Sequence, residues 1–157
     1  MATVTNAPYI DAVTANLYNT EILRLAADTA LAVRLSDPDA SVEKRSPICG
    51  SRVTVDIDLG DDGRVAAVGM LVRACALGQA SSALLAQRIV GRSPAELASA
   101  RDALAAWLAG EGDAPDWPGL TLFEPARPHS ARHASIRLAF EAAAEAAADA
   151  AALRAAA

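Results

Sequence analysis

The chain has 157 residues, a formal net charge of −5 and 53% hydrophobic residues, and 40 of its residues are alanine. This length suits one domain with a substantial core. The acidic balance argues against non-specific nucleic-acid binding, which requires clustered Lys and Arg. No apolar run is long enough and free enough of charge to predict a transmembrane helix. Residues 1–11 lack the features of a signal peptide, so we expect a cytoplasmic protein with no membrane partner.

The amino-terminal part predicts a flexible segment followed by a helix. Residues 1–14 are polar and irregular, and we expect them to precede a single domain at 15–150 and an alanine-rich tail at 151–157. Apolar residues recur at spacings of three and four between about Asn16 and Val33. This pattern predicts the first helix of the domain.

The next part of the chain predicts a small antiparallel sheet. Residues 52–59 alternate strictly between polar and apolar, which is typical of a strand with one buried face. A Gly-Asp-Asp-Gly turn at 60–63 predicts a hairpin with a partner strand at 65–73, and residues 42–45 form a third candidate strand. Four acidic residues are interpreted as a solvated edge that discourages strand pairing: Asp56, Asp58, Asp61 and Asp62.

Helical patterns follow the sheet. One helix is expected at 76–90, and another begins after Ser93 with a capping box and ends near Ala109. Residues 111–128 are rich in Pro and Gly and predict a loop. A last helix is expected to start near Ser135, whose side chain would serve as the N-cap. The segregation of strands from helices predicts an α+β fold, a three-stranded antiparallel sheet with helices on one face.

Two cysteines are the main candidates for chemistry. Cys49 precedes the clearest strand, and Cys75 lies where the strand at 65–73 gives way to a helix, so the hairpin between them can bring the thiols together. A helix N-terminus favours the thiolate form, which attacks sulfur and binds metal. Two cysteines alone cannot complete a tetrahedral zinc site. The alternative is that each is a small buried packing residue.

The histidines give a weaker signal. His133 lies just before the last helix, where its side chain can project beyond the helix start, and His129 lies four residues earlier. A lone histidine is more often a surface residue or a satisfied core residue than a ligand. Neither a Ser/His/Asp pattern nor a glycine-rich phosphate loop is present, so no enzyme class is predicted.

Four stretches carry a resemblance to a known family. They are residues 17–23, residues 47–53 with Pro-Ile-Cys-Gly-Ser, residues 75–82 with Cys-Ala-Leu-Gly-Gln-Ala-Ser-Ser, and residues 132–142. They resemble the scaffold proteins of iron–sulfur cluster assembly, the family of IscU, SufU and the N-terminal domain of NifU. The long segment 91–128 is similar to an insertion in the SufU branch. The resemblance implies the IscU-like fold, also described as the SufE/NifU fold.

The resemblance also implies a ligand set, and this chain departs from it. The family uses three cysteines and an aspartate. Cys49 and Cys75 match two of the cysteines, whereas Ser51 stands at the aspartate position and Ser135 at the position of the third cysteine. We therefore expect a degenerate metal site with Cys49 and Cys75 as ligands. His133 is a candidate third ligand, and His129 is the other histidine that could replace the missing cysteine.

The resemblance implies a non-enzymatic scaffold-like protein that accepts sulfur, or holds a transient iron–sulfur cluster, iron or zinc, at Cys49 and Cys75. Its expected partners are a cysteine desulfurase and apo iron–sulfur acceptor proteins. Two alternatives remain open. One is a divergent member that binds or modulates a desulfurase with little or no metal. The other is a small dithiol redox protein.

Overall fold

The computed structural model describes residues 17–28 and 33–157, and its centre is a three-stranded sheet. The strands β1 (Ala40–Arg45), β2 (Arg52–Leu59) and β3 (Val65–Arg73) pair antiparallel in the order β1-β2-β3. One face of the sheet packs against the hydrophobic core. The side chains that alternate along β2 on this face are therefore fully buried: Val53, Val55 and Ile57. The predicted strands and hairpin are confirmed.

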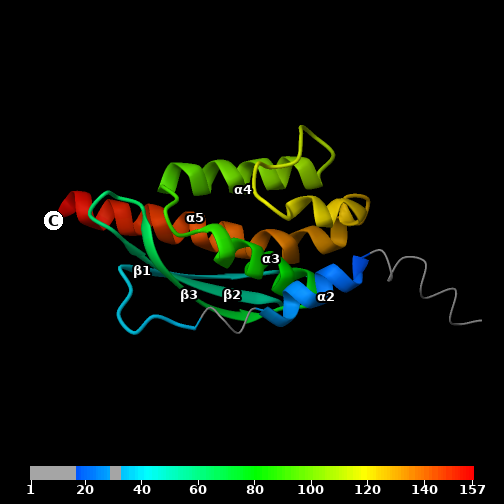
Figure 1. Cartoon of the computed structure of the whole chain (residues 1–157), viewed down its shortest axis with the longest axis horizontal. Helices are drawn as coiled ribbons and strands as arrows, with labels where there is room; N and C mark the ends of the chain where they lie inside the picture. Colours follow the sequence, from blue (N-terminus) through cyan, green and yellow to red (C-terminus); the bar gives the residue numbers. More distant parts are fainter. Residues whose placement is uncertain (1–16, 29–32) are drawn as a thin grey trace, which may run out of the picture.

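Helices cover that one face (Figure 1). The helix α5 (His133–Ala156) packs on β1 and β2, and α3 (Ala76–Arg88) lies beside α5 and against β3. The helix α4 (Pro94–Leu108) packs on α5 and forms an outer layer, whereas α2 (Thr20–Ala27) packs on α3. This arrangement confirms the predicted α+β class.

Several helix boundaries follow local sequence signals. The Ser93 hydroxyl accepts a hydrogen bond from the Glu96 N–H, and the Glu96 carboxylate accepts one from the Ser93 N–H. The helix α4 therefore starts with the predicted capping box. The segment 111–128, predicted as a loop, includes the 3-10 helix η3 (Leu120–Ala126), and a shorter one, η4 (Ser130–Arg132), follows it. Within the described part of the chain, no helix combines the length and the apolar character that crossing a membrane requires.

The helix predicted between about Asn16 and Val33 corresponds to the shorter helix α2. It begins at Thr20, where the Asn19 side chain accepts a bond from the N–H of Ile22, and it ends at Ala27, so the prediction of helix as far as Val33 is wrong. The backbone at 33–35 instead crosses the outer face of the sheet over Gly69, where an added Cβ would lie 2.5 Å from the Leu35 nitrogen. Residues 1–16 and 29–32, including the predicted flexible segment at 1–14, lie outside the described residues.

One predicted surface aspartate is buried. Asp56 has no exposed surface, because β2 is the central strand and the segment at 33–35 covers this part of its outer face. The Arg34 guanidinium donates two hydrogen bonds to the carboxylate at 2.6 and 3.1 Å, and the Ser41 hydroxyl and the Leu35 N–H donate two more at 2.6 and 3.0 Å. Burial alone would raise the pKa of Asp56, but these four donors outweigh it and lower the pKa. The interpretation of Asp56 as part of a solvated edge is wrong.

We predict that Asp56→Ala lowers the free energy of unfolding at neutral pH by about 2 kcal/mol, because it removes the buried carboxylate that accepts hydrogen bonds from Arg34, Ser41 and Leu35. A lowered native pKa adds stability that is present above the unfolded pKa and lost as the pH falls through the native one. The difference in free energy of unfolding between Asp56→Ala and wild type should therefore be largest above about pH 5 and decrease below about pH 4. Urea unfolding across this range measures it, with the exposed tip residue in Asp61→Ala as the control. A difference independent of pH would contradict this account.

Candidate functional site

Cys49 lies in the tight loop between β1 and β2. The Ser46 N–H donates to the Ser51 carbonyl at 2.9 Å and closes the loop, and Gly50 adopts a φ of 75°, which an L side chain rarely tolerates. The Ser46 hydroxyl oxygen accepts bonds from the N–H groups of Ile48 and Cys49, both at 3.3 Å. The loop therefore holds Cys49 in a defined turn at one end of the sheet.

The Cys49 sulfur is surrounded by serine hydroxyls. Its Sγ lies 3.1 Å from the Ser51 Oγ and 3.2 Å from the Ser135 Oγ, and it is also hydrogen-bonded to the Ser46 hydroxyl. All three serines are at least 95% buried, so their side chains are fixed around the sulfur. The two sequence positions where the resemblance implies an aspartate and a cysteine thus lie beside Cys49, but each supplies a hydroxyl.

These hydroxyls favour the thiolate form of Cys49. Hydrogen bonds from Ser135, then Ser46 and Ser51, together with the Ser51 backbone, lower the pKa of Cys49 to about 6, against a small opposing effect of burial. At pH 7 roughly nine-tenths of the sulfur is then ionised, whereas an ordinary cysteine is only about 3% thiolate. A partly exposed thiolate of this kind is a nucleophile.

The position of Ser135 depends on a close contact between two helices. An added Cβ on Gly78 in α3 would lie 3.1 Å from the Ser135 carbonyl oxygen, and the Ser81 hydroxyl donates to the Ile136 carbonyl at 2.6 Å. The predicted N-cap role of Ser135 is wrong: α5 begins at His133, its N-cap is Arg132, and Ser135 is buried inside the first turn. Its side chain points to Cys49 and does not cap the helix.

Cys75 stands at the N-cap of α3, as predicted, and its side chain makes no hydrogen bond to the helix backbone. The Tyr18 hydroxyl is hydrogen-bonded to the Cys75 side chain. Burial raises the pKa of Tyr18, negative charge on Cys75 and Cys49 raises it further, and the Arg132 guanidinium opposes this rise. The phenol thus keeps its proton at neutral pH, next to both cysteines. Arg132 lies over the Tyr18 ring, 6.0 Å from its centroid.

His133 is engaged elsewhere. Its Nε2 lies 2.9 Å from the Ala126 carbonyl and 3.0 Å from the Arg127 carbonyl, so this nitrogen carries the proton and donates to the preceding segment. His129 lies on that same segment, as the N-cap of η4. Across residues 17–28 and 33–157, no group of three or more His, Cys, Asp or Glu side chains is placed to hold a metal ion. The structure therefore does not bring His133 together with the two cysteines.

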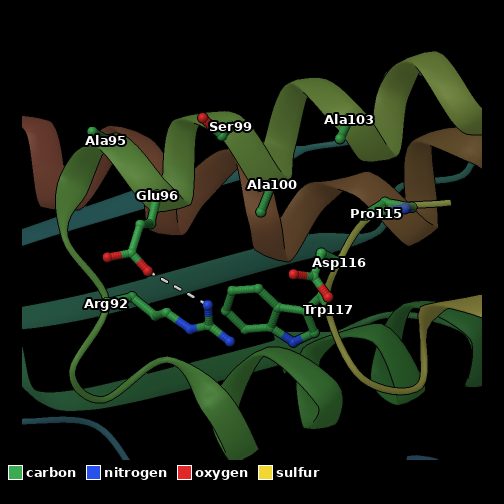
Figure 2. A pocket seen from close by; sticks show the side chains of 9 residues that line it. All are labelled: Arg92, Ala95, Glu96, Ser99, Ala100, Ala103, Pro115, Asp116 and Trp117. Carbon is green, nitrogen blue, oxygen red and sulfur yellow. Dashed lines mark hydrogen bonds and ion pairs between the residues drawn. The ribbon is translucent and has the colours of Figure 1, made fainter. Parts of the chain in front are cut away.

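A groove beside the outer helix α4 is separate from the cysteines. Figure 2 shows it between α4 and the segment around Trp117, with a volume of about 460 Å³. Arg92 lies 4.6 Å from the centroid of the Trp117 ring and 3.5 Å from a carboxylate oxygen of Glu96. Its lining has no cysteine or histidine: Arg92, Ala95, Glu96, Ser99, Ala100, Ala103, Pro115, Asp116 and Trp117. The candidate site is therefore the cluster around Cys49 and Cys75.

Sequence reasoning missed two residues of this cluster. Ser46 immediately precedes the Pro-Ile-Cys-Gly stretch, and its spacing of three from Cys49 is typical of a serine that bonds a turn backbone. Tyr18 lies in the first of the four family-like stretches, but its distance of 57 positions from Cys75 gave no local signal. Both belong to the site because of contacts made on folding.

No family model matches the chain, and no curated protein sequence matches it. Among solved structures, the chain is similar to the N-terminal part of a nitrogen-fixing NifU-like protein from Brucella abortus, with 39% identity, a TM-score of 0.80, and coverage of 88% of this chain and 96% of that one.

A second solved structure shares the fold. It is a putative iron–sulfur cluster assembly scaffold protein for the SUF system from Fervidobacterium islandicum AW-1, with 17% identity, a TM-score of 0.77, and coverage of 85% of this chain and 98% of that one. The assignment to the SufU branch stays a prediction. The likeness to the NifU-like structure confirms the family resemblance, and the chain belongs to the NifU-like family of iron–sulfur cluster assembly scaffold proteins.

Proposed function

We propose that this chain serves iron–sulfur cluster assembly as a sulfur acceptor, with Cys49 as the acceptor and Cys75 beside it. The observation that carries the proposal is the contact of the Cys49 sulfur with the hydroxyls of Ser51 and Ser135 at 3.1 and 3.2 Å. Hydroxyl donors stabilise a thiolate, which is the form that attacks sulfur. As metal ligands, these neutral hydroxyls are much weaker than the carboxylate and the thiolate of the family ligand set.

The donor set fits a bound cluster poorly. Clusters in proteins are usually held by four ligands, most often cysteine thiolates. Here Cys49 and Cys75 are free cysteines that can supply two sulfur ligands, but the remaining two family positions, Ser51 and Ser135, present neutral hydroxyls. We therefore propose that a cluster is at most a transient cargo of this chain, and that the site is degenerate as a scaffold.

The transfer of sulfur to Cys49 is an exchange between a thiolate and a persulfide, so it needs no oxidant. The Cys49 thiolate attacks the outer sulfur of a persulfide on a donor protein, a new S–S bond forms, and the donor's S–S bond breaks. The donor's inner sulfur leaves as a thiolate, while the transferred outer sulfur keeps its proton and becomes the terminal sulfur of a persulfide on Cys49. The Ser51 and Ser135 hydroxyls hold the attacking sulfur ionised until the bond forms.

The partners follow from this step. The donor is a protein that carries a persulfide, the role of a cysteine desulfurase, and the recipients are proteins that use the sulfur for clusters. We propose that the chain is a carrier and not an enzyme, because the donor supplies the activated sulfur. The exposed Cys49 loop, with Ile48 70% exposed, leaves the sulfur accessible to a partner.

We predict that Ser135→Ala raises the pH midpoint of Cys49 alkylation by about one pH unit from the wild-type value, because a hydrogen bond to a charged group is lost. Iodoacetamide rates are measured from acid to alkaline pH in a Cys75→Ala background, so that one thiol reacts. The midpoint is the readout, because a less acidic thiolate is also a stronger nucleophile and partly offsets the rate at neutral pH.

The matched control for this measurement is Ser99→Ala, which removes an exposed hydroxyl on α4. Its midpoint should stay at the wild-type value of about 6. Equal midpoints in wild type and Ser135→Ala would show that the hydroxyl does not stabilise the thiolate, and the proposed acceptor role would lose its support.

We predict that a cysteine desulfurase, supplied with cysteine, loads one sulfur atom onto Cys49. Intact-mass spectrometry should show the added sulfur in wild type and in Cys75→Ser and its loss in Cys49→Ser, because Cys49 is the sulfur held by the serine hydroxyls. Reduction with a thiol should remove the added mass. Loading of Cys75 alone would overturn the assignment of the acceptor.

We predict that wild type reconstituted with iron and sulfide gives only a labile cluster, and that Ser51→Asp combined with Ser135→Cys gives a longer-lived one. The two changes place a carboxylate and a thiol at the positions next to Cys49. Visible absorption retained after gel filtration, with iron analysis, measures the difference, and Ser99→Cys serves as the control for an added thiol. A stable stoichiometric cluster in wild type would refute the degenerate-site proposal.

A further inference from the structure

The outer face of the sheet carries a row of arginines at the end where the cysteines lie. Arg45 on β1 pairs directly opposite Arg52 on β2, and Arg52 pairs directly opposite Arg73 on β3. Side chains at directly paired positions share one face and have Cβ atoms about 5 Å apart. Lys44, next in sequence to Arg45, faces the other way and bonds Glu145 of α5. This arginine row (Arg45, Arg52 and Arg73) is therefore on the face opposite to the one on which the described helices α3 and α5 pack.

The arginine row is expected to destabilise the folded sheet, and only Arg45 among its three members forms an ion pair with the described residues. Like charges directly opposite each other destabilise a sheet. Glu43 bonds Arg45 at 2.8 Å, and its pKa is lowered by that bond and by the charges of Arg45 and Arg52. Arg52 and Arg73 form no ion pair with any residue in the described ranges. The chain as a whole is acidic, with a net charge of −5, so this local excess of positive charge is not a result of composition.

The surface around the row is hollowed and partly apolar. A hollow of about 210 Å³ is lined by Glu43, Arg52, Thr54, Leu71 and Arg73. Leu71 is 41% exposed beside the row, and at the same end of the sheet the loop residue Ile48 is 70% exposed. Arginine combined with exposed large apolar side chains is typical of the centre of a protein–protein interface. A site for a small inorganic anion would not need the apolar part.

The row also lies close in the chain to both thiols. Arg52 follows Cys49 by three residues, and Arg73 precedes Cys75 by two. We propose that the arginine row binds an acidic segment of a partner protein, with carboxylates on Arg52 and Arg73 and an apolar side chain against Leu71. This docking does not depend on whether Cys49 accepts sulfur, and it would place the partner next to the two cysteines.

The probe is a short fluorescent peptide rich in glutamate with a central leucine, and its binding is followed by anisotropy at low salt. Arg52→Gln combined with Arg73→Gln should weaken binding by about tenfold. Lysine at both positions keeps the charge and should keep most of the affinity. Arg88→Gln is the control, because Arg88 is exposed, lies at the opposite end of α3 from Cys75 and forms no ion pair with the residues that the structure describes. Its affinity should equal that of wild type.

Several outcomes would overturn the proposal. Equal weakening in Arg88→Gln would indicate a general charge effect. Inorganic phosphate that displaces the peptide at matched ionic strength would assign the hollow to a small anion. Self-association in sedimentation that disappears in the double glutamine variant would assign the row to a second copy of this chain. A melting temperature of the double glutamine variant below that of wild type would show that the arginines serve the fold, whereas an equal or higher one is expected.

Discussion

The site depends on the close approach of α3 and α5 at Gly78. The absence of a side chain at Gly78 lets the Ser135 backbone come near, and the Ser81 hydroxyl fixes the two helices with a bond to the Ile136 carbonyl. That contact sets the start of α5 and brings the Ser135 hydroxyl to 3.2 Å from Cys49. Without it, the loop between β1 and β2 would hold a cysteine with only its local serines.

Serine hydroxyls at positions 51 and 135, where the family has an aspartate and a cysteine, change the chemistry of the site. Two chain segments that are far apart in sequence still meet at the Cys49 sulfur: the loop at 46–51 and the first turn of α5. A carboxylate and a thiol would offer charged ligands to a metal. Serine hydroxyls instead donate hydrogen bonds and stabilise negative charge on a single sulfur. The two positions where the resemblance implies ligands thus supply hydroxyls beside a nucleophilic sulfur.

The sequence predicted the elements whose causes are local. The alternation along β2, the Gly-rich hairpin turn and the capping box at Ser93 each depend on a few neighbouring residues, and each is confirmed. Asp56 was misjudged because its burial depends on the central place of β2 and on a segment about 20 positions earlier. Ser135 was misjudged because its local pattern suits an N-cap, whereas its contact with Cys49 spans 86 positions.

The alanine face of α5 has a consequence for how this protein can vary. Ala139, Ala142, Ala143, Ala146 and Ala147 are all almost completely buried, so the helix axis sits close to the sheet and to its neighbouring helices. The space beside each of these alanine methyl groups cannot accept a larger side chain, because closely packed interiors accommodate added volume poorly. Any larger residue along this face would lift the helix, and its first turn would carry Ser135 away from the sulfur. The chemistry at one end of the molecule is therefore constrained by side-chain volumes several helical turns away.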